Sequence, residues 1–247
     1  MKLAEMTWPE VDSLPRDLVV VVPLGSCEQH SYHLPFLTDS LLVGAIAEAV
    51  EARLQNDVLL LPVQWLGISL HHLTFPGTLS AELDTHVALL CEIAESLLHA
   101  GFTTFFFLNG HGGNQETMGL ALRQLQADHP EGTFAGASYW DAALDALRSH
   151  LETQSYAGHA GEMETSLMLH LFPEQVRDDR LGKDGQWLPP VFAGVTLAWD
   201  VGERTDHGGL GDATAASAAK GQRLFAAIVN RLVEVIRALR AGEHLIS

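Results

Sequence analysis

A loop near the N-terminus brings together side chains of the types that bind metal ions. It contains Glu28 and His30, and Asp39 opens the helix predicted after it. Alternate residues of an extended segment share a face, so Glu28 and His30 can converge on one centre. Without an ion, the same residues would be a solvated acid, a loop histidine and a helix cap. Carboxylates mixed with imidazole favour Zn²⁺, Mn²⁺ or Fe²⁺ over Ca²⁺, which takes oxygen ligands alone.

A glycine-rich turn with the sequence NGHGGN, residues 109–114, supplies a further histidine, His111. Glycines on both sides of one histidine suit a ligand in a sharply bent loop, and Asn109 and Asn114 are expected to fix that turn. A phosphate-binding loop is the competing interpretation, but the run lacks both the GxGxxG and the GxxxxGK spacing. A tight turn without a ligand is the other alternative.

The segment HAGEMETS, residues 159–166, places a histidine beside two acids at the start of a predicted helix. Glu162 and Glu164 cannot face the same way once the helix has begun, so only one of them is expected to join His159. Acidic residues in a first helical turn also complement the helix dipole without any ligand.

Adjacent histidines open a fourth segment, HHLTFPGT at residues 71–78. Their side chains are expected to point apart, so that one faces the site while the other is exposed. We expect His72 to support the metal ligands, as His33 does from the first loop.

Together these loops hold enough ligands for two ions. A bridging carboxylate such as Asp39 would hold the ions about 3.5–4 Å apart, where they lower the pKa of a bridging water and polarise a carbonyl. This arrangement is suited to the hydrolysis of an amide.

The elements that must position these loops alternate between strand and helix, which is the pattern of parallel βαβ units. Open parallel sheets bind ligands beyond the carboxyl ends of their strands, so the loops should meet at one edge. We therefore predict an α/β fold, a single-domain α-β-α sandwich with a mostly parallel sheet over residues 1–247. The predicted strands are residues 18–23, 58–63, 102–108 and 133–139, and the predicted helices are 39–55, 82–100, 116–128, 140–151, 162–171 and 213–239.

The composition excludes several classes of protein. The 247 residues include 31 acidic and 14 basic side chains, a net charge of −17, yet 47% are hydrophobic, which is enough for a large core. Such a charge repels phosphate backbones and anionic lipids, so we expect no nucleic-acid or membrane partner. The absence of a signal-like or membrane-spanning run, with only two cysteines, predicts a cytoplasmic protein without a disulfide framework.

Over nearly its whole length the chain resembles the creatininase family of metal-dependent amidohydrolases. The resemblance is carried by GSCEQHSYHLPFLTDS (residues 25–40), HHLTFPGT, FLNGHGGN and HAGEMETS, and more loosely by GLGDATAASAAKG (residues 209–221). It implies a creatininase-like sandwich, two divalent metal ions per chain and a homo-oligomer, since hexamers built from dimers are known in the group. By position, the family's metal ligands fall on Glu28, His30, Asp39 and His111, with Asp39 as the bridging carboxylate.

The chain also departs from the family's pattern. Creatininase has a metal-binding glutamate where this chain has Gly113, which argues against creatinine as substrate and suggests that Glu164 completes the metal site. His159 matches a histidine proposed in the family to pass protons to the leaving nitrogen. Ser31 and Tyr32 stand where many members have Gly-Pro, so Tyr32 is expected at the rim of the pocket. The residues expected to contact substrate or to support the ligands are Tyr32, His33, His72, Asn109, Gly113, Asn114 and Glu162.

The predicted function is metal-dependent hydrolysis of a non-peptide or cyclic C–N amide bond in a small molecule, such as a formamide or a lactam. A metal-activated hydroxide would attack the carbonyl while His159 protonates the leaving nitrogen. Two other branches of the family have the NGHGGN form: a formamide hydrolase of deazaflavin biosynthesis and a peptidase-like member of mycofactocin maturation. A peptidase is therefore the alternative.

Two further alternatives differ in mechanism or class. Cys27 is a candidate nucleophile with His30 or His33 as its base, but strand alternation turns its thiol away from Glu28 and His30, into the core. A non-catalytic binding or assembly protein would keep the metal for structure, and protein ligands would then close the metal's coordination.

Overall fold

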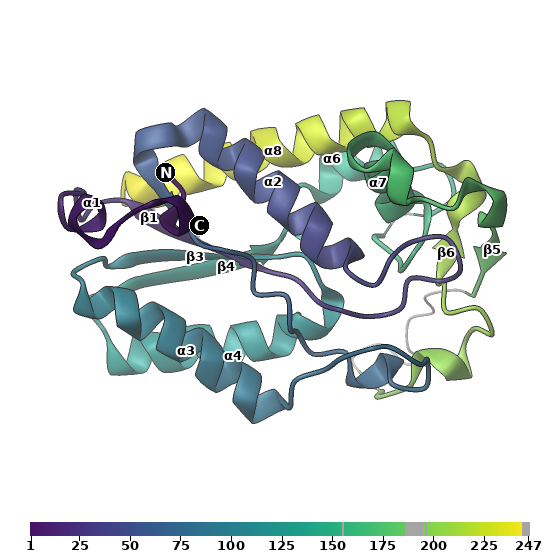
Figure 1. Ribbon diagram of the computed structural model, residues 1–247, viewed down its shortest axis with the longest axis horizontal. Coiled ribbons are helices and arrows are strands. Elements are labelled where there is room, and N and C mark those ends of the chain that lie inside the picture. The colour runs from purple at the N-terminus through teal and green to yellow at the C-terminus, as the bar shows by residue number, and fades with distance from the viewer. Residues whose placement is uncertain (155, 186–194, 196, 244–247) are drawn as a thin grey trace.

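The computed structural model describes residues 1–154, 156–185, 195 and 197–243 (Figure 1). Its main sheet has four parallel strands in the order β2-β1-β3-β4. These strands are β1 (Val19–Leu24), β2 (Val58–Leu60), β3 (Thr104–Asn109) and β4 (Thr133–Ser138). In register, Leu24 lies opposite Asn109, and Asn109 opposite Ser138, so β1, β3 and β4 end at the same edge. The predicted α/β fold with a mostly parallel sheet is confirmed.

Helices cover both faces of this sheet, because alternate residues of each strand point to opposite sides. In β1, Val19 and Val21 belong to one hydrophobic core, and Val20 and Val22 to the other. The first core is shared with α2 (Thr38–Leu54), α7 (Glu162–Leu171) and α8 (Ala218–Arg240), and the second with α3 (Leu83–His99) and α4 (Gln115–Asp128). Figure 1 shows these two layers above and below the sheet.

Several boundaries differ from those predicted. The second strand ends at Leu60, and the helix predicted over residues 140–151 is divided, because Ala143 has the non-helical angles φ −112° and ψ 17°. The last helix begins at Ala218 because the Ser217 side chain caps it there. The remaining elements are α1 (Trp8–Asp12), α5 (Tyr139–Ala142), α6 (Leu144–Arg148), and the antiparallel pair β5 (Lys183–Asp184) and β6 (Gly211–Asp212). Among the described residues, no helix combines the length and the apolar character needed to cross a membrane.

Candidate metal centre

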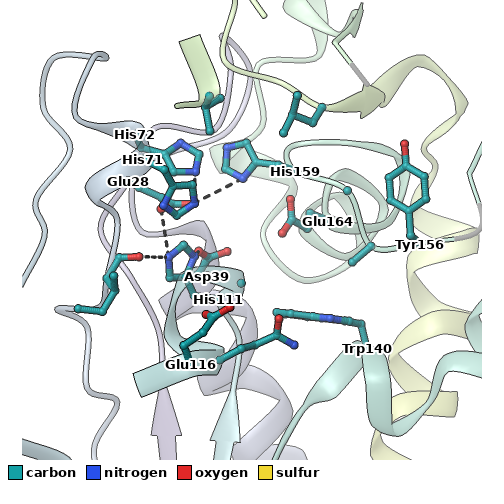
Figure 2. A pocket seen from close by; sticks show the side chains of 18 of the residues that line it. Glu28, Asp39, His71, His72, His111, Glu116, Trp140, Tyr156, His159 and Glu164 are labelled. Carbon is teal, nitrogen blue, oxygen red and sulfur yellow. Dashed lines mark hydrogen bonds and ion pairs between the residues drawn. The ribbon is translucent and has the colours of Figure 1, made fainter. Parts of the chain in front are cut away.

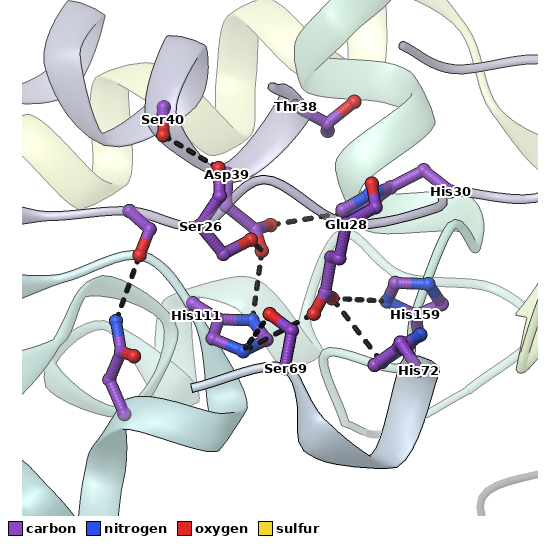
Figure 3. Close-up of polar contacts among 12 residues, drawn as sticks. Ser26, Glu28, His30, Thr38, Asp39, Ser40, Ser69, His72, His111 and His159 are labelled. Atoms are coloured by element: carbon purple, nitrogen blue, oxygen red, sulfur yellow. Dashed lines mark hydrogen bonds and ion pairs between the residues drawn. The ribbon is translucent and has the colours of Figure 1, made fainter. Parts of the chain in front are cut away.

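Acids and histidines from separate loops converge beside the carboxyl edge of the sheet (Figure 3). Glu28 and His30 follow β1, and His72 belongs to a short 3₁₀ turn, Leu70–His72, which follows β2. His111 follows β3, and His159 precedes α7. All five side chains are buried, with His159 the most exposed at 8%. The fold therefore brings together residues that are far apart in the chain.

Asp39, at the start of α2, lies between two of these histidines. His30 Nε2 is 3.1 Å from Asp39 Oδ1, and His111 Nδ1 is 2.9 Å from Oδ2. Ser26 Oγ donates a hydrogen bond to Oδ2 at 2.7 Å. Burial alone would raise the pKa of Asp39, but His30 and His111 hold it well below its usual range. Asp39 is therefore a carboxylate that stays ionised inside the protein.

The Glu28 carboxylate faces three imidazoles yet makes no hydrogen bond within the described residues. The nearest nitrogens of His72, His111 and His159 lie 3.3, 3.3 and 3.5 Å from its carboxylate oxygens. Both of those oxygens are buried without a hydrogen-bond partner in the described part of the chain. Burial raises the pKa of Glu28 to about 7. A buried carboxylate in this state is costly unless a cation accompanies it.

The ring nitrogens of the histidines indicate where that cation belongs. His30 Nδ1 donates to the backbone oxygen of Glu28 at 3.1 Å, and His159 Nε2 donates to that of Gln29 at 2.8 Å. Their other nitrogens face carboxylates, and each can offer its lone pair to an ion that takes the place of a proton there. His111 lies between Glu28 and Asp39, and its Nε2 donates to the Ile68 carbonyl oxygen at 2.8 Å, so one of its nitrogens faces each carboxylate. Metal-binding histidines characteristically hold their other N–H on a carbonyl or carboxylate in this way.

The pKa values of the histidines lead to the same conclusion. Burial lowers the pKa of His30, but Asp39 overcomes this and raises it to about 10. Burial likewise lowers that of His111, and Glu28 and Asp39 raise it to about 9. In contrast, burial lowers the pKa of His71 to about 4, so this ring is neutral at neutral pH. The cluster thus favours positive charge beside its carboxylates, carried by protons when no metal is bound.

Overlapping sets of side chains could each hold an ion, with possible ligand atoms within 4.8 Å of one another. Glu28 belongs to three of these sets, which makes it the centre of the cluster. The mixture of carboxylate and imidazole donors fits Zn²⁺, Mn²⁺ or Fe²⁺. The sets are Glu28 with His30 and Asp39, Glu28 with His71 and His111, Glu28 with His72 and His159, and Glu164 with His30 and His159.

The two acids of the HAGEMETS segment have different surroundings. Glu164 is buried beside the cluster, and burial raises its pKa to about 7. Glu162 instead accepts hydrogen bonds from the backbone N–H groups of Glu152 and Thr153 and pairs with the Lys220 ammonium group. The prediction that Glu162 contacts substrate or supports the ligands is wrong, because its charge is already neutralised elsewhere.

The asparagines of the NGHGGN turn fix it as predicted. Asn109 donates to the His111 carbonyl at 2.7 Å and accepts from the His111 N–H at 3.1 Å. Asn114 accepts from the Ile68 N–H at 2.9 Å and donates to the Gly25 carbonyl at 3.0 Å. These two side chains therefore tie together the loops that follow β1, β2 and β3.

Tyr32 and His33 lie outside the cluster. Tyr32 is 56% exposed, and its ring is 4.8 Å from that of His207. It does not line the cavity described below, contrary to the prediction that it forms the rim of the pocket. His33 is buried, and its Nε2 is 2.9 Å from Thr165 Oγ1, so it supports α7 rather than a ligand.

Sequence reasoning missed His71 and Gln29. In a 3₁₀ turn successive side chains are about 120° apart, so both His71 and His72 can border one cavity. The expectation that one of them is exposed is therefore wrong. Gln29 Nε2 donates to His72 Nδ1 and to the Gly208 carbonyl, both at 2.8 Å, and no local sequence pattern indicated this connection.

A cavity of about 700 Å³ opens beside the cluster (Figure 2). Its polar side includes Glu28, Asp39 and Glu164. Figure 2 shows Trp140 and Tyr156 on the other side. Cys27 does not line this cavity, and burial raises the pKa of its thiol, so it is poorly suited to act as a nucleophile.

A parallel α/β sheet with a buried carboxylate and imidazole cluster at its carboxyl edge is typical of hydrolases that use divalent metals. The model of a family described as creatininase, creatinine amidohydrolase, matches residues 4–236. The chain therefore belongs to the creatininase family, whose members are hydrolases, as the resemblance predicted.

Relatives with different activities are similar to this chain. A mycofactocin precursor peptide peptidase of Mycobacterium ulcerans is 35% identical, over 93% of this chain and 85% of that protein. A creatinine amidohydrolase of Pseudomonas putida is 29% identical, over 95% of each chain. A solved structure described as creatininase Mn is 29% identical with a TM-score of 0.82, over 96% of this chain and 97% of the other.

Proposed function

We propose that this protein is an amidohydrolase that cleaves a C–N amide bond with two divalent metal ions. The observation that carries the proposal is the Glu28 carboxylate, which is fully buried and has no hydrogen-bond partner among the described residues. It lies among imidazole nitrogens that can bind metal, and a cation placed there would relieve the cost of its burial. The proposed ligands are Glu28, His30, Asp39, His111 and Glu164.

Two divalent ions would polarise the substrate carbonyl and lower the pKa of a water molecule. The proposed ions are Zn²⁺, Mn²⁺ or Fe²⁺. One creatininase structure is described as Mn and another, of a mutant, as Zn-Zn type. The mixed nitrogen and oxygen donors of this cluster are compatible with each of these metals.

His159 is the proposed proton carrier. Its Nε2 is held by the Gln29 carbonyl, which leaves Nδ1 on the side of Glu28. Burial lowers the pKa of His159 well below its usual range, so the ring is neutral at neutral pH. It takes the proton that the attacking water loses as the C–O bond forms, and gives it to the leaving nitrogen as the C–N bond breaks.

The substrate is proposed first as a small non-peptide or cyclic amide, such as a formamide or a lactam. A peptide bond is the second candidate. The name of the peptidase relative supports this second candidate. The cavity does so as well, since about 700 Å³ with an apolar wall of Trp140, Leu144 and Tyr156 accommodates a substrate much larger than creatinine.

The test begins with protein stripped of metal by a chelator and reloaded with Zn²⁺, Mn²⁺ or Fe²⁺. Formamides, lactams, cyclic ureas and short peptides are then assayed for amine release. We expect one class to be hydrolysed only by reloaded protein, and a Glu28→Ala variant to be inactive. Turnover that chelation does not affect, or less than one ion per chain, would contradict the proposal.

Two ions without turnover of any compound would favour the non-catalytic binding or assembly protein instead. Light scattering of the same preparation tests the proposed homo-oligomer.

A further inference from the structure

Gly113 stands where the resemblance to creatininase implies a metal-binding glutamate, and no side chain fits there in this fold. A Cβ atom at this position would lie 2.0 Å from the Ile68 carbonyl oxygen and 3.0 Å from Cε1 of His71. The first distance is far inside van der Waals contact with a backbone atom. The space that a residue 113 side chain would use is therefore taken by the loop that follows β2.

We propose that His71 supplies the metal ligand that position 113 cannot supply. His71, His111 and Glu28 each bring a possible ligand atom within 4.8 Å of the other two. Ligand atoms around one tetrahedral Zn²⁺ lie about 3.4 Å apart, given Zn–N bonds of about 2.1 Å. The three ligand atoms, at most 4.8 Å apart, would have to approach by no more than about 1.4 Å to reach that spacing. This inference rests on the proposed metal centre and names one of its ligands.

His111 meets this requirement in the tautomer whose Nδ1–H donates to Asp39, 2.9 Å away. Its Nε2 lies 3.3 Å from Glu28 Oε2 and donates to the Ile68 carbonyl oxygen at 2.8 Å, and an ion bound at Nε2 would take the place of that hydrogen. Asp39 Oδ1 remains beside His30 for the second ion, in the set that also contains Glu28. Glu28 belongs to both of these sets, so its carboxylate would help to hold either ion.

His71 is free for this role, whereas its neighbour His72 is not. Within the described residues, His71 makes only ring contacts, at 4.4 Å to His72 and 6.0 Å to His111, and it lines the cavity. His72 accepts a hydrogen bond from Gln29 through Nδ1 and faces Glu28 with Nε2. His72 thus orients the Glu28 carboxylate, while the nitrogens of His71 are uncommitted.

The test compares wild type with His71→Ala, His71→Glu and a control, His99→Ala, which removes an exposed histidine of α3. Each protein is stripped of metal, reloaded with Zn²⁺ and desalted, and its ions per chain are counted by mass spectrometry. We expect two ions in wild type and in His99→Ala, and one in His71→Ala. His71→Glu should recover the second ion, because a carboxylate replaces the lost ligand. The affinity for that ion, measured by chelator competition, should fall more than about 100-fold in His71→Ala.

Each outcome separates this inference from the proposed function. Two ions of wild-type affinity in a folded His71→Ala protein overturn the role of His71 and leave the metal centre intact. Less than one ion in wild type overturns both. If circular dichroism shows that His71→Ala is unfolded, the visible absorption spectra of Co²⁺-loaded wild type and Co²⁺-loaded His71→Glu are compared instead. A shift between the two spectra supports His71 as a metal ligand, and identical spectra overturn that role.

Discussion

Two buried carboxylates of this protein, Glu28 and Glu162, are equally inaccessible but differ in their partners. Both residues are 0% exposed. Glu162 accepts hydrogen bonds from the backbone of Glu152 and Thr153 and from the Thr153 hydroxyl, and it pairs with Lys220. The Glu28 carboxylate has no hydrogen-bond partner among the described residues and is surrounded by imidazoles.

The pKa values of the two acids reflect this difference. Burial raises the pKa of both groups, but hydrogen bonds from Lys220 and Thr153 bring that of Glu162 below its usual value. The pKa of Glu28 stays raised, at about 7. The protein thus neutralises Glu162 with its own cation, Lys220, which joins α7 to α8. It leaves the Glu28 carboxylate without such a partner among the described residues. An acid left in that state is a candidate for function rather than for stability.

Glu28→Gln should have the largest effect on metal binding. Removal of the central ligand charge is expected to weaken metal binding more than about 100-fold, since even residues that only support a ligand contribute 10- to 100-fold. The free energy of unfolding of the metal-free protein should not fall, because an unpartnered buried acid is lost. Chelator competition and urea unfolding measure the two effects. Unchanged metal affinity would remove Glu28 from the centre.

Glu162→Gln should show the opposite behaviour. Lys220 is 2% exposed and would keep only the exposed Glu152 carboxylate, 3.0 Å away, in place of its buried partner. We therefore expect a loss of about 3 kcal/mol in the free energy of unfolding, at the low end of the cost of breaking a buried ion pair. The number of metal ions per chain should not change. A double variant, Glu162→Gln with Lys220→Met, should recover most of the stability, because no buried charge remains. A loss of metal ions in Glu162→Gln would contradict the distinction between a structural Glu162 and a metal-binding Glu28.

The metal-free protein should lose stability as the pH rises. Although burial lowers their pKa values, the neighbouring acids raise that of His30 to about 10 and that of His111 to about 9. These values exceed the unfolded value of about 6.5. The protonated rings therefore stabilise the fold fully below about pH 6.5, and the contribution is lost as the pH rises through 9 and 10.

Thermal unfolding of metal-free protein at pH 7 and pH 9.5 measures this effect. Protein loaded with Zn²⁺ is the control and should change less, because the ion replaces the protons. A metal-free melting temperature that does not fall between these pH values would contradict the assigned charges.

Ser31→Gly should have the smallest effect, a gain in stability of about 1 kcal/mol. Ser31 has φ +56°, a left-handed conformation that glycine adopts without steric cost. Its N–H bond to Gln29 Oε1, at 2.8 Å, survives the change. Ser149→Gly is the matched control, since Ser149 has φ −73° and gains nothing from glycine. A lower melting temperature for Ser31→Gly would show that the hydroxyl outweighs the strain.

Much of the fold could be predicted from local pattern. The buried run of β1 and the apolar spacing of α2 each arise within a few residues, so their positions were predicted to within a residue or two. The helix break at Ala143 was not predicted, because no glycine or proline marks its non-helical angles in the sequence. The residues of the metal centre likewise divide into those that local pattern could locate and those that depend on tertiary contacts. Glu28 and His111 could be located because they follow strands that end at a common edge.

The sequence by itself determined that this chain carries acids and histidines at strand ends, and the family to which it belongs, because those signals lie in short contiguous motifs. Only the tertiary structure decided which acids lack partners. Lys220 reaches Glu162 from 58 residues along the chain, and Gln29 meets His159 from 130 residues away. Whether a buried charge is neutralised depends on such distant contacts, which no local periodicity encodes.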